Sequence, residues 1–185
     1  ARVMLGESLS ALREAGVLVP KTSSKHVSVK EAVLPFDRFP MTDAVLGPEM
    51  RSTGEVMGID STPGLAFAKS QIAAGTDLPD EGTVFLSVAD RDKAAVVEAA
   101  RCFVGLGFSI VATSGTAAAL EAQGLSVTQV VSKVGEDTGT TAVDLIESGA
   151  VQLVINSPRG RGPRADGAHI RSAAGGRGIP LLTTA

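Results

Sequence analysis

The sequence predicts an α/β protein with a five-stranded parallel, Rossmann-like sheet and flanking helices, preceded by an incomplete α+β unit. Three observations support this. From residue 83 onward, short apolar segments alternate with helical segments, which is typical of a parallel sheet covered on both faces. Residues 1–76 lack that alternation and have too few elements for a closed core. The polar residues 77–82 separate the two parts as a linker.

The first part, residues 1–76, is expected to hold two helices and one strand. Ala1–Ala15 is predicted to be a helix stopped by Gly16, and His26–Leu34 a strand whose valines alternate. Pro35–Gly58 is a long segment punctuated by Gly and Pro. The next helix has its N-cap at Ser61 or Thr62, Pro63 in its first turn, an apolar stripe of Leu65, Ala68 and Ile72, and a stop at Gly75.

The second part, residues 83–185, is predicted to contain five strands joined by four helical crossovers. The expected strands are Thr83–Val88, Phe108–Ala112, Val127–Val131, Val151–Asn156 and Ile179–Thr183. The expected helices are one capped by Asp90 with Val97, Ala100 and Val104 on its apolar side, then Thr116–Gln123, Thr141–Ser148 and Asp166–Ala174. The crossovers are expected to be right-handed.

Composition excludes several classes of function. The net charge of −3 and the 3% aromatic content argue against nucleic-acid binding, since neither a basic surface nor base-stacking side chains are available. No apolar run is long enough to predict a membrane span. The lone Cys102, expected in the core, is compatible with a reduced cytosol. His26 and His169 lack metal-ligand spacing, and Glu136 and Asp137 are expected in a solvated loop. We therefore predict neither a catalytic residue nor a metal site.

The candidate site lies at the carboxyl ends of the predicted strands, where ligands bind in open parallel sheets. The residues there carry hydroxyl, ammonium and amide groups rather than carboxylates, which favours a phosphate-bearing anion. The predicted phosphate-binding residues are Lys93, Thr113, Gly115, Thr116 and Lys133, with Ser87 and Asn156 as further pocket residues. Simple helix capping by the Thr113–Thr116 turn is the alternative.

The segment Pro158–Arg177 is the other basic feature, because it holds five arginines against Asp166 alone. It is either a solvated loop followed by a basic helix or a flap over the bound anion.

Two motifs resemble a known family. Residues 46–58, LGPEMRSTGEVMG, resemble a signature near the end of the second ATP-grasp unit of the carbamoyl phosphate synthase large subunit, and Ser28–Phe36 is similar to the segment before it. Residues 83–185 resemble the C-terminal regulatory domain of that enzyme, which is methylglyoxal synthase-like. The resemblance implies domains at 1–76 and 83–185, joined by the linker 77–82.

This resemblance implies a nucleotide monophosphate effector of the UMP or IMP class. The lysines and threonines that contact phosphate in the family match Lys93, Thr113, Thr116 and Lys133, and Ser87 and Asn156 match pocket positions. Pro158 replaces a family threonine. Some members also bind ornithine, and Glu31, Leu34 and Thr183 match the two sides of that site. Leu181 and Leu182 replace a Tyr-Asp pair there, which removes an acid.

The resemblance further implies a role in a glutamine-hydrolysing, cytoplasmic ligase of pyrimidine and arginine biosynthesis. That enzyme uses ATP with magnesium or manganese, and its partners would be a glutaminase small subunit and the rest of the large subunit. The present chain is expected to bind no cofactor and to be non-catalytic alone. The alternatives are a methylglyoxal synthase-like lyase, disfavoured because Asn156-Ser157-Pro158 lacks the Asp-Pro of that enzyme, and a free-standing nucleotide-binding module.

Overall fold

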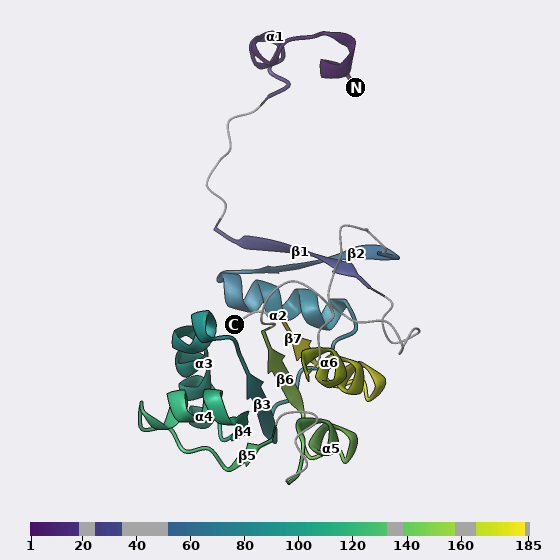
Figure 1. Ribbon diagram of the computed structural model, residues 1–185. Helices are drawn as coiled ribbons and strands as arrows, with labels where there is room; N and C mark the ends of the chain where they lie inside the picture. Colours follow the sequence, from purple (N-terminus) through teal and green to yellow (C-terminus); the bar gives the residue numbers. More distant parts are fainter. Residues whose placement is uncertain (19–24, 35–51, 133–138, 158–165, 184–185) are drawn as a thin grey trace.

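The structure, a computed structural model, describes residues 1–18, 25–34, 52–132, 139–157 and 166–183. Its main feature is a five-stranded parallel sheet in the order β5-β4-β3-β6-β7, which confirms the predicted fold class (Figure 1). The strands are β3 (Thr83–Ser87), β4 (Ser109–Thr113), β5 (Gln129–Val131), β6 (Leu153–Asn156) and β7 (Leu181–Leu182).

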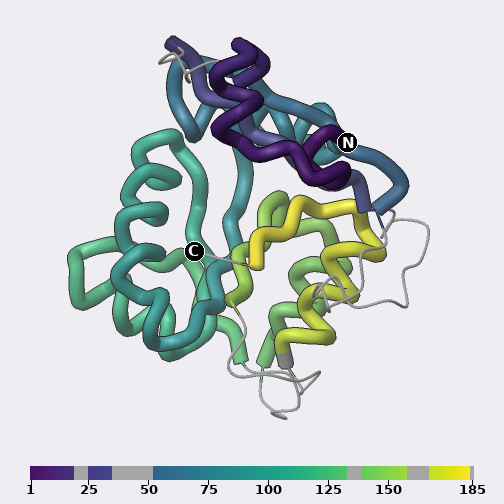
Figure 2. The backbone as a smooth tube through the Cα atoms, turned by 90° about the horizontal axis from the view of Figure 1, so that it is seen from above, coloured from purple at the N-terminus to yellow at the C-terminus, as the bar shows by residue number. Residues whose placement is uncertain are grey.

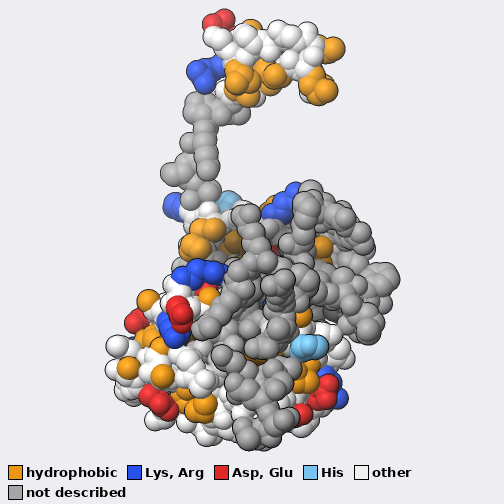
Figure 3. Space-filling view, in the orientation of Figure 1, with side chains coloured by type: hydrophobic (Ala, Val, Ile, Leu, Met, Phe, Trp, Pro, Cys, Tyr) orange, Lys and Arg blue, Asp and Glu red, His pale blue; other side chains and the backbone are white. Residues whose placement is uncertain are grey.

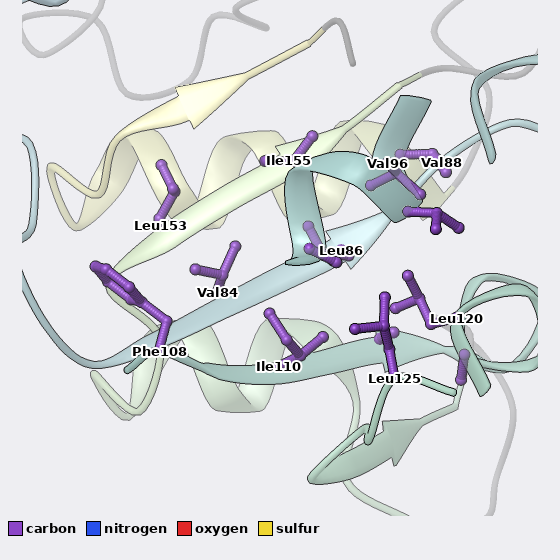
Figure 4. Packing of buried hydrophobic residues seen from close by; sticks show 14 residues of the cluster. Val84, Leu86, Val88, Val96, Phe108, Ile110, Leu120, Leu125, Leu153 and Ile155 are labelled. Carbon is purple, nitrogen blue, oxygen red and sulfur yellow. The ribbon is translucent and has the colours of Figure 1, made fainter. Parts of the chain in front are cut away.

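Helices cover both faces of this sheet. One face is covered by α3 (Lys93–Gly105) and α4 (Ser114–Glu121), and the opposite face by α5 (Ala142–Glu147) and α6 (Asp166–Gly176). Figure 2 shows the same separation, with α3 and α4 on one side of the strands and α6 on the other. The two apolar clusters include side chains that are fully buried, such as Leu86 and Ile146. Figure 4 shows the first cluster, where Leu86, Ile110 and Leu120 meet between the sheet and the two helices.

Residues 52–75 and 25–34 form a separate small unit. β1 (Val27–Val33) pairs antiparallel with β2 (Gly54–Asp60), and α2 (Pro63–Ala73) packs on the hairpin. The strand β2 begins within the Gly- and Pro-punctuated segment Pro35–Gly58, for which no strand was predicted. Gly58 explains the packing, because a Cβ there would lie 1.9 Å from the carbonyl oxygen of Ala66. Only glycine permits that approach, and a Gly-rich sequence hides its strand character.

The helix α2 has the predicted ends but turns a different face inward. Thr62 caps it by accepting a hydrogen bond from the Leu65 N–H at 3.3 Å, and Gly75 follows with φ of 95°. However, Ala66 and Ser70 are buried, whereas Leu65 and Ile72 are more than half exposed. The hairpin is so close that small residues face it, and the larger apolar residues lie outside. The predicted stripe is therefore wrong.

The N-terminal segment contains two short helices instead of one long helix. A 3-10 helix, η1 (Val3–Leu5), ends at Gly6 with φ of 93°, and α1 (Leu9–Glu14) begins after Ser8, whose hydroxyl accepts from the Ala11 N–H at 3.1 Å. The left-handed glycine and the new N-cap together break the predicted helix. Apolar side chains gather on one side of this segment (Figure 3), and Met4 and Leu5 are almost fully exposed.

Two details of α3 also differ from expectation. Asp90 does not cap this helix: it lies in the 3-10 turn η3 (Asp90–Asp92), and its carboxylate pairs with Lys93. Cys102 is exposed rather than in the core, and Val104 is 44% exposed. The buried side of α3 is instead formed by Val96, Val97 and Ala100.

Candidate functional site

The strand order changes direction at the carboxyl ends of β3 and β6, the place where open parallel sheets form a binding crevice. The chain leaves β3 to build β4 and β5 on one side, and then returns to build β6 and β7 on the other. The helix after β3 covers one face and the helix after β6 covers the opposite face, so the two connections diverge at this point. Ligands of open parallel sheets bind at such a switch point. Ser87 and Asn156, which are register partners, are the last residues of these two strands.

Three hydroxyl groups meet at the ends of β3 and β4. The Thr113 Oγ1 atom lies 3.3 Å from Ser87 Oγ and 3.4 Å from Thr116 Oγ1. Thr116 is buried, and its Oγ1 also accepts a hydrogen bond from the Val88 N–H at 3.2 Å. Because a hydroxyl has one proton, Thr113 can donate to only one of these neighbours at a time. The cluster can therefore rearrange to donate to an added acceptor.

The first turn of α4 adds backbone donors beside this cluster. Thr113 occupies the N-cap position, yet its side chain makes no capping hydrogen bond with the helix. The Thr113 side chain therefore does not cap α4, and capping by other groups of the turn stays the alternative. The first N–H groups of a helix lack intrahelical partners and lie at the positive end of its dipole. They suit an anionic oxygen.

The ammonium of Lys93 lies above the same turn. It pairs with the exposed carboxylate of Asp90 at 2.8 Å, and a Cβ on Gly115 would lie 3.8 Å from Nζ. The Lys93 side chain is 29% exposed, so it borders the site without being sealed in it. A full positive charge, backbone donors and hydroxyls thus converge on one edge of the sheet. Lys133 lies outside the described residues, as do Glu136, Asp137 and Pro158.

The β6 side of the crevice is tied to β3 by hydrogen bonds. The Asn156 amide donates from Nδ2 to the Ser87 carbonyl oxygen at 3.1 Å, and the Ser157 N–H donates to the same oxygen at 3.2 Å. The Ser157 hydroxyl accepts from the Ala89 N–H at 2.9 Å. The Arg171 guanidinium donates from Nη1 to Asn156 Oδ1 at 3.2 Å.

Arg171 and Ser157 were not predicted as site residues. Arg171 was placed among the arginines of a solvated loop and basic helix or of a flap, but its side chain is buried. The sequence does hold one signal of this burial. Gly167 precedes Arg171 by one helical turn and, having no side chain, leaves room for the guanidinium. The other arginine described in this segment, Arg177, is exposed, as that interpretation expects.

The residues predicted for ornithine are all half-buried. Glu31 is in β1, Leu34 follows it, and Thr183 follows β7. Within the described residues, no hydrogen bond or ion pair joins Glu31 to Thr183. The assignment of these residues therefore stays a prediction.

Other features of the described chain lie away from the crevice. A hollow of about 510 Å³ lies at the opposite, amino end of the sheet, between the linker and the turn from α6 to β7. Asp60 and Asp144, whose pKa values are lowered by hydrogen bonds from Lys69 and Thr141 respectively, are also outside the site.

In the described part of the chain, no three His, Cys, Asp or Glu side chains cluster as metal ligands. None of the described helices combines the length and apolarity that a membrane crossing requires.

These groups lie on a sheet whose family can be identified. Residues 95–183 match the MGS-like domain family. The whole chain also matches curated relatives. It is 50% identical over 201 residues to the "Carbamoyl phosphate synthase large chain" of Mycobacterium sp. (strain JLS), covering 100% of this chain and 18% of that protein.

Two further relatives carry the same description. The Rubrobacter xylanophilus protein is 52% identical over 184 residues, which cover 99% of this chain and 17% of that protein. The Synechocystis sp. protein is 47% identical over 182 residues, which cover 98% of this chain and 16% of that protein. The chain belongs to the carbamoyl phosphate synthase large-chain family and corresponds to its C-terminal region. It spans less than a fifth of the length of these relatives.

Proposed function

We propose that the MGS-like domain of this chain binds a nucleoside monophosphate and thereby regulates a carbamoyl phosphate synthase. The observation that supports this most directly is the convergence of Lys93, the Thr113–Ser87–Thr116 hydroxyls and the first turn of α4 at the crevice. These groups donate hydrogen bonds and carry positive charge, as a phosphate monoester requires. UMP and IMP are the candidate effectors.

The wider role follows from the family. The complete enzyme would make carbamoyl phosphate from bicarbonate and glutamine-derived ammonia, using ATP with magnesium or manganese. Its partners would be a glutaminase small subunit and the remainder of the large subunit, in the cytoplasm. We propose that the present chain binds the effector and performs no chemistry, because Asp90 is the only carboxylate that the described contacts connect to the site, and it already pairs with Lys93.

The proposal is tested by titrating the protein with UMP, IMP and ornithine, using calorimetry on the wild type and on Lys93→Met. A charge-assisted hydrogen bond contributes about 1.5–3 kcal/mol, so this change should weaken nucleotide binding about 10- to 100-fold. Melting temperature should hardly change, since Asp90, the partner in the lost ion pair, is largely exposed to water. The weakening should diminish at high salt.

Lys30→Met is the matched control, because Lys30 is an exposed, ion-paired lysine in the hairpin. It should leave nucleotide affinity unchanged. If Lys93→Met and Lys133→Ala both bind UMP and IMP as tightly as the wild type, the phosphate site is wrongly assigned. Formation of methylglyoxal from triose phosphate by the pure protein would favour the lyase alternative.

A further inference from the structure

Arg171 is an unusual residue for the interior of this domain. Its side chain is 4% exposed, although it lies on α6, and burying a guanidinium is unfavourable unless hydrogen bonds replace its lost hydration. One such hydrogen bond is donated by Arg171 Nη1 to the side-chain oxygen of Asn156, at 3.2 Å. Asn156 is itself 4% exposed and is the last residue of β6. The buried cation is therefore connected directly to the rim of the crevice.

The backbone of α6 makes room for this contact. Gly167 lies one turn before Arg171, and a Cβ on it would lie 2.6 Å from Arg171 Nη1 and 3.1 Å from Asn156 Oδ1. A side chain at Gly167 would thus displace the guanidinium or the amide. The same geometry means that the first turn of α6 covers the amide oxygen of Asn156.

The two neighbours of Asn156 fix the direction of its amide. A guanidinium can only donate hydrogen bonds, so the atom facing Arg171 must be the oxygen. A backbone carbonyl can only accept, so the atom facing the Ser87 oxygen, 3.1 Å away, must be the nitrogen. A rotation that exchanged the two atoms would break both hydrogen bonds. Within the described contacts, one Nδ2 proton is used, and the second is the group that Asn156 can offer to a ligand.

We infer that Arg171 is a positioning residue that makes this site select ligands carrying a hydrogen-bond acceptor. It holds Asn156 so that the site presents an N–H donor and hides the amide oxygen. A nucleobase whose oxo group faces the Asn156 N–H can accept its hydrogen bond. An amino group at the same place would set two hydrogen-bond donors against each other. The inference rests on the proposed nucleotide site and adds a basis for choosing between nucleotides.

The test compares pairs of nucleotides that differ by oxo and amino groups, namely UMP with CMP and IMP with AMP. The wild type should bind the oxo member of at least one pair about 10-fold or more tightly, the usual effect of leaving a buried donor pair unsatisfied. Arg171→Met keeps the length of the side chain but releases the Asn156 amide. In this variant the ratio of oxo to amino nucleotide affinity should fall to about 3-fold or less. Arg171→Lys keeps the charge but has no planar fork, and should not restore the ratio.

Two further variants separate selectivity from folding. Asn156→Asp keeps the shape and the Arg171 contact but replaces the N–H donor by an acceptor, so it should remove or reverse the oxo preference even if Arg171→Met folds poorly. It also loses the hydrogen bond to the Ser87 carbonyl oxygen, so its melting temperature is measured beside the affinities. Arg177→Met removes an exposed arginine just beyond the same helix and should change neither the ratio nor the melting temperature. In the ligand-free protein, Arg171→Met should also shift the Asn156 side-chain amide signals in nitrogen-15 NMR spectra.

The outcomes distinguish the positioning role of Arg171 from the proposed nucleotide binding itself. A protein that binds UMP or IMP but keeps the same ratio in Arg171→Met and Asn156→Asp would overturn the role of Arg171 alone. A wild type that favours the amino members would do the same. A wild type that binds none of the four nucleotides would overturn the proposed function, and the inference about Arg171 would fall with it.

Discussion

The hairpin unit and the parallel sheet domain stabilise themselves by different means. In the sheet domain, both faces of β3 are covered, and Val84, Phe85 and Leu86 are fully buried in succession. In the hairpin unit, α2 covers one face, and the outer face exposes Met57 and Ile59 at 56% and 49%. The sheet domain has two apolar clusters of its own, whereas the described hairpin unit buries little beyond small residues. The contrast indicates that the described hairpin unit has little apolar core of its own.

Separating the two parts should produce the largest effect. We expect residues 83–185 alone to unfold cooperatively, because they contain both apolar clusters, and residues 1–76 alone to lack a cooperative transition. Circular dichroism melting curves of the two pieces check this. Cooperative melting of residues 1–76 would contradict the comparison.

A matched pair of leucine truncations should reproduce the contrast within the intact chain. Leu86→Ala removes a fully buried side chain and should lower the free energy of unfolding by about 2–5 kcal/mol. Leu65→Ala removes one that is 54% exposed and should change it by no more than about 0.5 kcal/mol. Urea unfolding measures both. Similar losses would mean that Leu65 is covered in solution.

A pair of glycine substitutions probes the close contact between β2 and α2. Gly58→Ala places a methyl group against the Ala66 carbonyl and should loosen α2 at a local cost of about 1–3 kcal/mol. Gly64→Ala meets nothing within 4 Å in the first turn of α2 and should stabilise this helix by up to about 1 kcal/mol. Limited proteolysis at α2 should accelerate for the first variant and slow for the second. The sheet domain should melt unchanged in both.

The smallest expected effect concerns the capping box of α5. Thr141 donates from both its hydroxyl and its backbone N–H to Asp144, which holds the pKa of Asp144 below its usual 3.8. The stabilisation is therefore complete above pH 3.8 and is lost as the pH falls through the lowered folded-state value. Asp144→Asn should lose that part of the acid sensitivity, as measured by melting temperatures between about pH 5 and pH 2. Thr141→Ala should cost about 1 kcal/mol at neutral pH.

The parallel sheet was predictable from sequence because its strands are buried on both faces and read as short apolar runs between helices. The strand-end rule also placed Ser87, Thr113 and Asn156 at one edge without any knowledge of side-chain contacts. β2 could not be predicted from periodicity, because Gly58 stands where a buried apolar residue would mark the strand. Arg171 was missed for a related reason: its burial depends on a glycine one turn away, and composition alone assigns an arginine to the surface.

The start of β3 carries one more consequence. Gln152 accepts a hydrogen bond from the Thr83 N–H at 2.7 Å, donates from Nε2 to the Gly149 carbonyl at 2.9 Å, and fills the space above Gly82. The linker is therefore clamped where it enters the sheet instead of swinging freely. From that clamp, β3 runs about 13 Å to Ser87, and its three central residues are buried. The linker and the Ser87 edge of the sheet are thus the two ends of one short buried strand.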